Sequence, residues 1–445
     1  MKINTMYSVK IKHYNSIFKQ TVQIYRHAVD FFLDVALREW DAISPIKGLV
    51  NRKTVMEKLT VRTGRNRTPR YPFEDADKTF YKMPCYMRRA AIAEALGKAS
   101  SYKSSLKNWE SEDPKTRGME PSMPHAGYIY PALYRGNVYR QTGDYEAQVK
   151  IFVRNTWDWI MVQLRKSDMD YINKHCSGRK HCVPTLQKRG KEWFLDFAFE
   201  EKTELPYTSV YEQTIAAVDL GINSAATVSV MKSDGTVLGR HFLQLPKEQD
   251  SLTHAVNRIK KAQQHGARKT PRLWAKADGI NDAIAVKTAQ FIMDTAVLYN
   301  ADVIVFEHLD LNGKKHGSRK QLLHLWKSRY VQSMVSDKAH RLGMRVSHVN
   351  AWGTSRLAYD GSGRVLRGRE SGYRTNSVCV FATGKIYNCD LNASYNIGAR
   401  YFIREILKSL PATVRLAIEA EVPQCAKRST CTLSVLISLN AVLMA

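Results

Sequence analysis

Two short apolar runs that each end in a carboxylate limit the folds open to this chain. Residues 214–219 read TIAAVD, and residues 303–307 read VIVFE. Continuous apolar runs of this length are typical of strands buried on both faces, as in α/β domains. An acid at the end of such a strand costs free energy unless it is hydrogen-bonded or binds a cation. The pattern predicts an α/β sheet with Asp219 and Glu307 at one edge.

The segments around these runs predict the rest of that sheet. After the first run we expect two more strands, joined by the hairpin signal Ser-Asp-Gly-Thr. Helices and strands then alternate, and the expected elements are strands at 225–232 and 236–245, a helix at 283–299, a helix at 328–342 and a strand at 344–350. Three antiparallel strands followed by αβαβ is the element order of an RNase H-like fold.

Asp390 supplies a third acid, in the segment CDLNASYNI ahead of a helix that carries Ala393 and Ile397. Asp390 or Asn392 could simply cap that helix. If the helix instead returns to the sheet edge, three carboxylates meet there. Phosphodiester cleavage uses such a cluster, because carboxylate oxygens can hold two magnesium ions about 4 Å apart.

The N-terminal part of the chain predicts two further domains. The first residues alternate as in a β-strand, and a helix capped by Asn15 or Ser16 follows. A second helix has Arg88 and Arg89 near its start and an apolar side that runs from Ile92 to Trp109. From about residue 123 the pattern changes to period two, as in the strand WFLDFAFEE at 193–201. The apolar stripe of the first helix comprises Phe18, Val22, Tyr25, Val29, Phe32 and Ala36.

The charge balance points to a polyanionic partner. The 445 residues include 68 Lys and Arg but only 41 Asp and Glu, for a net charge of +27, which favours nucleic acid over a merely solvated basic surface. Trp274 and Trp326 lie among the basic runs and either stack on bases or pack in a core. The candidate phosphate contacts are Arg258, Lys260, Lys261, Arg268, Lys269, Arg272, Lys276, Lys314, Lys315, Arg319, Lys320, Lys327 and Arg329.

The cysteines and apolar segments bear on location. Seven widely spread cysteines fit a reducing cytoplasm better than a disulfide framework. The most apolar segment, 433–445, is shorter than the ~20 residues of a membrane span, and it either packs as a helix or mediates association.

A candidate zinc site is the segment HCSGRKHC, which contains His175, Cys176, His181 and Cys182. A tight loop between two strands is favoured there, because the spacing of these residues is not a usual ligand pattern.

The three acids carry a resemblance to a known family. Asp219 in AAVDLGIN, Glu307 in VIVFEHL and Asp390 in CDLNASYNI resemble the motifs of the RuvC-like nucleases of TnpB proteins and compact type V CRISPR effectors. The segments at 127–139 and 183–201 are similar to that family's wedge β-barrel. The resemblance therefore covers nearly the whole chain.

The resemblance implies a domain arrangement. Residues 1–13 and 123–210 would form the wedge β-barrel, and 14–122 an inserted helical recognition lobe. Residues 211–350 and 389–445 would form the RuvC-like nuclease domain. Residues 351–388 would bind the target nucleic acid, with Arg356, Arg364, Arg367, Arg369 and Arg374 as strand contacts.

The resemblance also implies a function: an RNA-guided DNA endonuclease that reads a short target-adjacent motif and cleaves with two magnesium ions. Asp219, Glu307 and Asp390 would be the catalytic residues and metal ligands. The implied partners are a guide RNA, from a transposon end or a CRISPR array, and double-stranded target DNA, with one chain per guide. The implied location is the prokaryotic cytoplasm, with the nucleoid. The alternatives are an RNA-guided repressor or transposition accessory protein without efficient cleavage, and a strand-transferring transposase.

One departure from the family concerns zinc. TnpB proteins usually carry a four-cysteine zinc module between the second and third acids. The corresponding positions here fall near Ala358, Gly361, Val380 and Thr383, and none is cysteine. We therefore expect a zinc-free target-binding segment.

Overall fold

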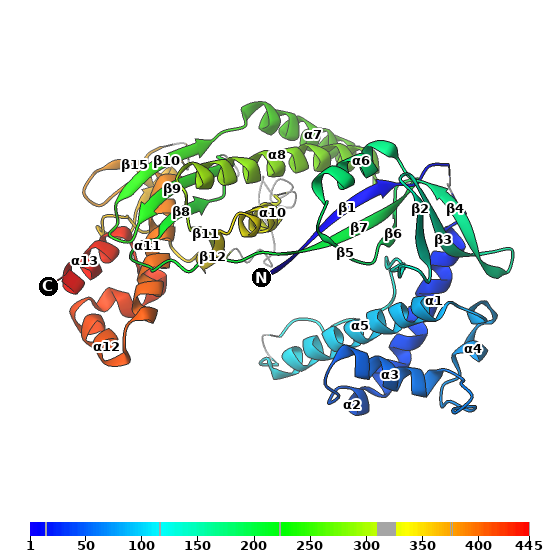
Figure 1. The fold of residues 1–445 in the computed structure, drawn as a ribbon. Helices are drawn as coiled ribbons and strands as arrows, with labels where there is room; N and C mark the ends of the chain where they lie inside the picture. Colours follow the sequence, from blue (N-terminus) through cyan, green and yellow to red (C-terminus); the bar gives the residue numbers. More distant parts are fainter. Residues whose placement is uncertain are drawn as a thin grey trace. The chain divides into compact units, whose positions relative to one another are not determined.

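The computed structural model describes residues 1–13, 16–114, 117–221, 224–308, 326–373, 375 and 377–444. The chain forms two compact units (Figure 1). The N-terminal unit comprises residues 2–201, and the C-terminal unit comprises Met1 with residues 202–445. Each unit has hydrophobic core clusters of its own.

The N-terminal unit contains the predicted helical segment, which has more helices than its pattern indicates. All six residues of the predicted apolar stripe are buried, five of them in the first helix and Phe18 at its N-cap. The expected cap is wrong for Ser16, because Phe18 is the N-cap and makes no side-chain cap hydrogen bond; Asn15 lies outside the described residues. The helices are α1 (Lys19–Arg38), α2 (Trp40–Ile43), α3 (Leu49–Thr60), α4 (Phe73–Ala76) and α5 (Cys85–Ser111), with a 3-10 turn η1 (Lys78–Phe80).

The β-strands of this unit form two sheets. One has the order β1-β7-β5 with β6 also on β7, and the other has the order β2-β3-β4. A bridge between Ile11 and Leu164 links them. The closed wedge β-barrel stays a prediction. The elements are β1 (Lys2–Lys10), β2 (Tyr139–Gly143), β3 (Glu146–Val153), β4 (Thr156–Gln163), α6 (Lys166–His175), β5 (Lys180–His181), β6 (Thr185–Arg189) and β7 (Glu192–Lys202).

The HCSGRKHC segment differs from the expected loop between two strands. His175 is the last residue of helix α6, Cys176 caps that helix, and His181 lies in strand β5. The segment therefore connects a helix to a strand. The helix was missed because its apolar stripe is short, with only Met169 and Ile172 buried.

The C-terminal unit is built on a five-stranded sheet with the predicted element order. The strand order is β10-β9-β8-β11-β12. Strands β8, β9 and β10 are antiparallel neighbours, whereas β11 runs parallel to both β8 and β12. The strands are β8 (Thr214–Asp219), β9 (Ala226–Lys232), β10 (Val237–Leu243), β11 (Val303–His308) and β12 (Arg345–Asn350).

Helices cover both faces of this sheet, which explains why its central strands are apolar throughout. Ile215 and Ala217 of β8 lie in the core cluster of α11 (Cys389–Ser409). Their neighbours Ala216 and Val218 lie in the cluster of α8 (Pro271–Leu298) and α10 (Ser328–Arg341). Figure 1 shows α8 and α11 on opposite sides of the sheet. Helix α7 (Pro246–Gln264) packs against α8.

The remaining elements follow β12. A small three-stranded sheet precedes α11, and short helices follow it. The apolar C-terminal segment is a packed helix, since Leu436 and Leu439 are fully buried in the cluster around α11. Among the described residues, no helix combines the length and apolar character needed to cross a membrane. The elements are β13 (Leu366–Arg367), η2 (Gly368–Ser371), β14 (Val378–Val380), β15 (Ile386–Asn388), α12 (Ala412–Glu421), η3 (Pro423–Ala426), η4 (Arg428–Thr430) and α13 (Leu433–Met444).

Candidate active site

Asp219 and Glu307 lie at the same edge of the five-stranded sheet. Strands β8 and β11 are parallel, and Val218 pairs with Phe306 immediately before the two acids. The carboxyl ends of parallel neighbours meet at one edge, so both acids emerge there. Each is half-buried at the end of a buried apolar strand.

Helix α11 brings Asp390 to this edge. The side chain of Asn388 caps the helix by accepting a hydrogen bond from the backbone N–H of Leu391 at 2.9 Å. Neither Asp390 nor Asn392 is therefore the N-cap, and this corrects the capping alternative. Asp390 occupies the first turn, where the helix dipole favours a negative charge.

The three carboxylates interact electrostatically. Burial raises the pKa of Asp219 well above its ordinary value of 3.8, and the charges of Glu307 and Asp390 raise it further. Burial also raises the pKa of Glu307 and of Asp390. An edge with this much unfavourable negative charge is one that a cation would stabilise.

The carboxylate of Glu307 is held by a neighbouring loop. The hydroxyl of Thr354 donates a hydrogen bond to Oε1 of Glu307, which offsets part of the rise in pKa. The side-chain amide of Gln332, on α10, donates to the backbone carbonyl of Glu307 at 3.0 Å. Glu307 is thus fixed through both its backbone and its side chain.

Helix α11 in turn holds the loop that carries Thr354. Arg400 is only 4% exposed, and its Nη1 donates to the carbonyls of Asn350 and Trp352 at 2.7 and 2.8 Å. Asn396 Nδ2 donates to the carbonyl of Thr354 at 2.9 Å. The same helix therefore carries Asp390 and positions the residue that binds Glu307.

Sequence inspection missed Thr354, Asn396 and Arg400 as residues of this site. The available signal was their polarity in apolar surroundings. Asn396 and Arg400 interrupt the helix sequence SYNIGARYF, and polar residues at buried helix positions need specific partners.

Arg367 contributes positive charge to the acidic edge. Its guanidinium lowers the pKa of Asp219 and of Asp390 against the effect of burial. Its Nη1 also donates to the hydroxyl of Ser355 at 3.0 Å. A hydrogen bond from Ser224 to Asp390 acts in the same direction. Among the residues that the structure describes, Arg367 is the predicted nucleic-acid contact whose charge acts on Asp219 and Asp390.

The donor set fits a hard divalent cation by its chemistry, since three carboxylates offer only oxygen ligands. In the part of the chain that the structure describes, however, no three His, Cys, Asp or Glu side chains form a complete metal-binding group.

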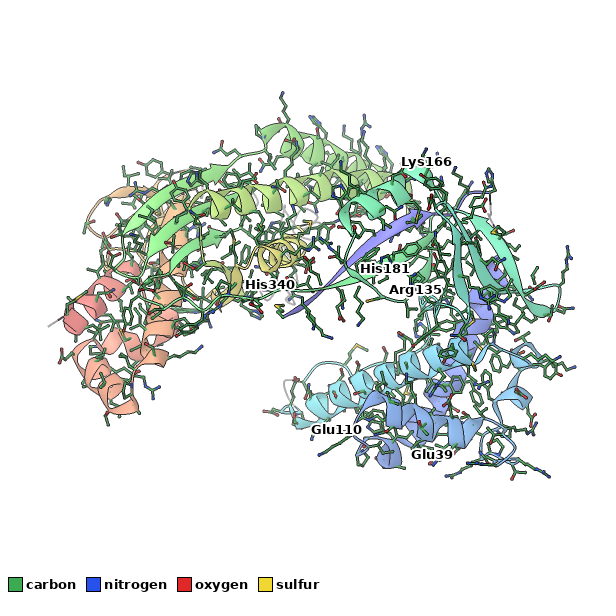
Figure 2. All side chains as sticks on the ribbon, viewed as in Figure 1. Glu39, Glu110, Arg135, Lys166, His181 and His340 are labelled. Carbon is green, nitrogen blue, oxygen red and sulfur yellow. The ribbon has the colours of Figure 1, made fainter. Side chains whose placement is uncertain are left out.

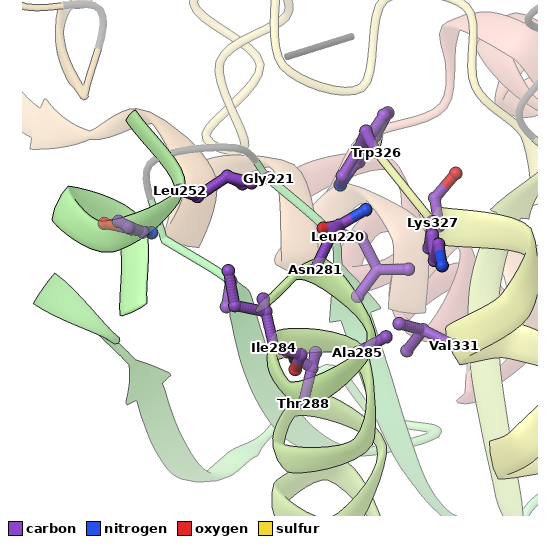
Figure 3. A pocket seen from close by; sticks show the side chains of 13 residues that line it. Leu220, Gly221, Leu252, Asn281, Ile284, Ala285, Thr288, Trp326, Lys327 and Val331 are labelled. Atoms are coloured by element: carbon purple, nitrogen blue, oxygen red, sulfur yellow. Dashed lines mark hydrogen bonds between the residues drawn. The ribbon is translucent and has the colours of Figure 1, made fainter. Parts of the chain in front are cut away.

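A small cavity lies just beyond the end of strand β8 (Figure 3). It measures about 50 Å³ and is lined by Leu220 and Gly221, directly after Asp219, and by α8 and α10. It is too small for a nucleobase, since a cavity that admits benzene measures about 150 Å³. Trp326 lines this cavity, whereas Trp274 packs against the α7–α8 core.

Most of the candidate phosphate contacts that the structure describes lie at the protein surface. Those on α7, on α8 and in their connection lie at the surface: Arg258, Lys261, Arg268, Lys269, Arg272 and Lys276 are exposed, and Lys260 is half-buried. Arg329 is also exposed. Lys314, Lys315, Arg319, Lys320 and Arg374 lie outside the described residues.

Lys327 departs from its expected role. Its ammonium forms ion pairs with Asp278 at 2.8 Å and with Asp282 at 2.5 Å, both on α8. These pairs leave it poorly placed to bind a phosphate. The sequence run around Lys327 contains no acid, but the packing of α10 against α8 supplies two.

The cysteines of the 351–388 segment and of α11 are buried together. Cys379 on β14 and Cys389 at the start of α11 belong to one core cluster with Phe381. A hydrogen bond between the two thiols lowers the pKa of Cys379. The thiols help to fill the small core beside Asp390.

Comparison with known proteins gives a family match and two relatives by sequence. The model of the Aq_aa04 family matches residues 5–153. The uncharacterized protein aq_aa04 of Aquifex aeolicus (strain VF5) is 31% identical over 128 residues, which are 26% of this chain and 69% of that protein. The TnpB-like protein aq_aa05 of the same organism is 26% identical over 237 residues, which are 47% of this chain and 74% of that protein.

The Cas12f1–sgRNA–target DNA complex, determined by cryo-EM, aligns with a TM-score of 0.34 and 14% identity, covering 89% of this chain and 98% of the compared chain. The sequence relatives establish the relationship. The chain belongs to the Aq_aa04 family, and its recognition from sequence as a relative of TnpB proteins is confirmed.

Proposed function

We propose that this chain is an RNA-guided DNA endonuclease that cleaves through an RNase H-like, RuvC-type site. The observation that carries the proposal is the meeting of Asp219, Glu307 and Asp390 at one sheet edge, where each carboxyl pKa is raised. The similarity to a TnpB-like protein supports this assignment. The repressor alternative is less favoured, because all three acids are present.

In this proposal the three acids would hold magnesium, most simply as two ions. Magnesium bound there would supply activation of the attacking water and charge stabilisation at the phosphate. Thr354 and Gln332 would orient Glu307, and the Asn388 cap would fix the first turn of α11 and with it Asp390. Arg367, whose charge lowers the pKa of Asp390, would attract the scissile phosphate.

The other domains would hold the nucleic acids. We assign the wedge role to residues 1–13 and 123–210, the recognition role to 14–122 and target-strand binding to 351–388. The exposed basic residues of α7 and α8 would contact the guide–target duplex through its phosphates. The partners would be one guide RNA and double-stranded DNA for each chain.

The test begins with the RNA that co-purifies when the protein is expressed with its flanking genomic DNA. We expect one species whose 3′ segment matches the neighbouring DNA. The purified complex should then cut a matching DNA duplex in magnesium but not in EDTA. Unselective cellular RNA in the preparation would contradict guided cleavage.

Active-site variants complete the test. Asp219→Asn, Glu307→Gln and Asp390→Asn should each abolish cleavage while the complex still binds its target. Asp337→Asn is a suitable control, because Asp337 is an exposed carboxylate on α10. Normal cleavage by any of the three active-site variants would remove that acid from the site.

A further inference from the structure

A second pocket lies in the N-terminal unit, between helix α6 and strands β2, β5 and β7. Its volume is about 230 Å³, more than the ~150 Å³ of a cavity that admits benzene. The buried rings of Phe197 and Phe199 on β7 and the apolar side chains of Met169 and Ile172 line it. Its size and aromatic lining suit a flat heterocyclic ring.

Arg135 and His181 line the pocket, and once they have bonded to each other their side chains have only hydrogen-bond donors left for a ligand. Arg135 Nη2 lies 3.3 Å from His181 Nδ1, and Arg135 Nε donates to the carbonyl of Cys182 at 3.3 Å. An arginine can only donate, so His181 Nδ1 accepts and its Nε2 carries the hydrogen. Burial and the charge of Arg135 lower the pKa of His181, which favours the neutral ring. Figure 2 shows the two side chains next to one another.

Other polar residues at the pocket provide an acceptor. Asp144 and Asn173 line it and are exposed, and no described residue forms a hydrogen bond or ion pair with the Asp144 carboxylate. The nearby Gln141 is already engaged, because its Oε1 accepts from Tyr139 and its Nε2 donates to the carbonyl of Gly143 at 2.7 Å. The pocket thus combines neighbouring donors with a carboxylate acceptor.

We propose that this pocket binds an unstacked guanine base of a nucleic acid, with Arg135 and His181 donating to the base and Asp144 accepting from it. Guanine presents two adjacent acceptors, O6 and N7, on one edge and two adjacent donors, N1–H and the N2 amino group, on another. The other bases lack such a pair of adjacent donors for a carboxylate. The net charge of +27 favours a nucleic-acid source over a free nucleotide.

The inference rests on the proposed function only in taking nucleic acid as the partner. It concerns recognition of a base and not cleavage, so it can be tested without metal. The catalytic variant Asp219→Asn should keep the guanine preference. A failure of cleavage can therefore be told apart from a failure of base recognition.

The experiment measures binding of fluorescein-labelled RNA octamers to the full-length, nucleic-acid-free protein in EDTA. The sequences are UUUUUUUU, UUUGUUUU and UUUAUUUU. We expect the guanine octamer to bind about tenfold more tightly than the other two, as is typical of a bidentate base contact. Inosine in place of guanosine removes the N2 amino group and should give an intermediate affinity.

Variants then locate the preference. Asp144→Asn should bind all three octamers alike, with its affinity for UUUUUUUU unchanged. The matched control is Glu146→Gln, which changes the same charge at an exposed position two residues away and should keep the preference. Equal affinity of the wild-type protein for all three octamers, or a preference that survives in Asp144→Asn, would overturn the proposal.

The same measurement identifies the source of the base. A DNA octamer of thymidines with one dG should show the same preference if the pocket serves either strand type. If the preference is confined to RNA, the base belongs to the guide. Both results support guanine recognition, whereas an adenine preference in either octamer series contradicts it.

Discussion

The hydroxyl of Thr354 donates a hydrogen bond to the carboxylate of Glu307, across 47 residues of sequence. Thr354 lies in the loop after β12, and Glu307 lies near the end of the neighbouring strand β11. Because Asn396 of α11 binds the carbonyl of Thr354, the helix that carries one acid fixes the orientation of another.

Removing this hydrogen bond should reduce cleavage without unfolding the protein. Thr354→Val keeps the side-chain shape but has no donor, so the pKa of Glu307 should rise further and its orientation loosen. We expect at least a tenfold slower single-turnover rate, as is usual when a partner of a metal ligand is lost. Thr354→Ser keeps the hydroxyl and should retain most of the activity. An unchanged rate in Thr354→Val would show that the bond has no part in catalysis.

The charge of Asp219 should destabilise the metal-free protein at neutral pH. A carboxyl group with a raised pKa in the folded state contributes stability below its ordinary value of 3.8 and loses it as pH rises through the folded-state value. The melting temperature in EDTA should therefore fall less steeply with pH in Asp219→Asn than in the wild type as the pH rises above about 4. Asp337→Asn should follow the wild type. Parallel curves for Asp219→Asn and the wild type would contradict the raised pKa.

Replacing Arg400 should cost substantial stability. Its guanidinium satisfies the carbonyls of Asn350 and Trp352 and, at 3.1 Å, that of Cys431. Arg400→Met would leave these buried acceptors without their donor, and we expect the free energy of unfolding to fall by about 3 kcal/mol. Urea denaturation measures this change. Arg404→Met is the control, because Arg404 is more exposed, and a loss equal to that of Arg400→Met would rule out the special role of burial.

Two glycine substitutions should change stability in opposite directions. A Cβ at Gly398 of α11 would lie 2.6 Å from Met231 Sδ and 3.2 Å from Ala217 Cβ, so Gly398→Ala should destabilise by about 1–3 kcal/mol through overpacking. Gly279 of α8 has open space around its Cβ position, and Gly279→Ala should stabilise by about 0.5–1 kcal/mol. Chemical denaturation of both variants checks the signs. A stabilising Gly398→Ala would show that α11 does not pack this closely on β8.

The parts of the fold predicted from sequence are those that short-range patterns determine. Strands β8 and β11 are recognisable because helices bury both of their faces, which leaves a continuous apolar run before each acid. Helix α3 was missed because only Met56 and Thr60 are buried on it, so its sequence has almost no periodic signal.

The interactions that could not be predicted depend on partners distant in sequence. Nothing near Lys327 indicates that Asp278 and Asp282 would bind it, since both come from another helix. The cap of α11 was ambiguous for a different reason. Asn388, Asp390 and Asn392 are all good capping residues within five positions, and only the backbone geometry selects Asn388.

The dependence of the acidic edge on α11 has a consequence during synthesis. Asp219 and Glu307 leave the ribosome long before Cys389, where α11 begins, and Arg400 of that helix binds the carbonyl of Cys431. Domains fold as units as the chain emerges, so the three carboxylates cannot assemble until α11 and the segment around Cys431 have been made. A nascent chain that stops short of α11 would hold only two of the three acids, and under the proposed function it would be inert.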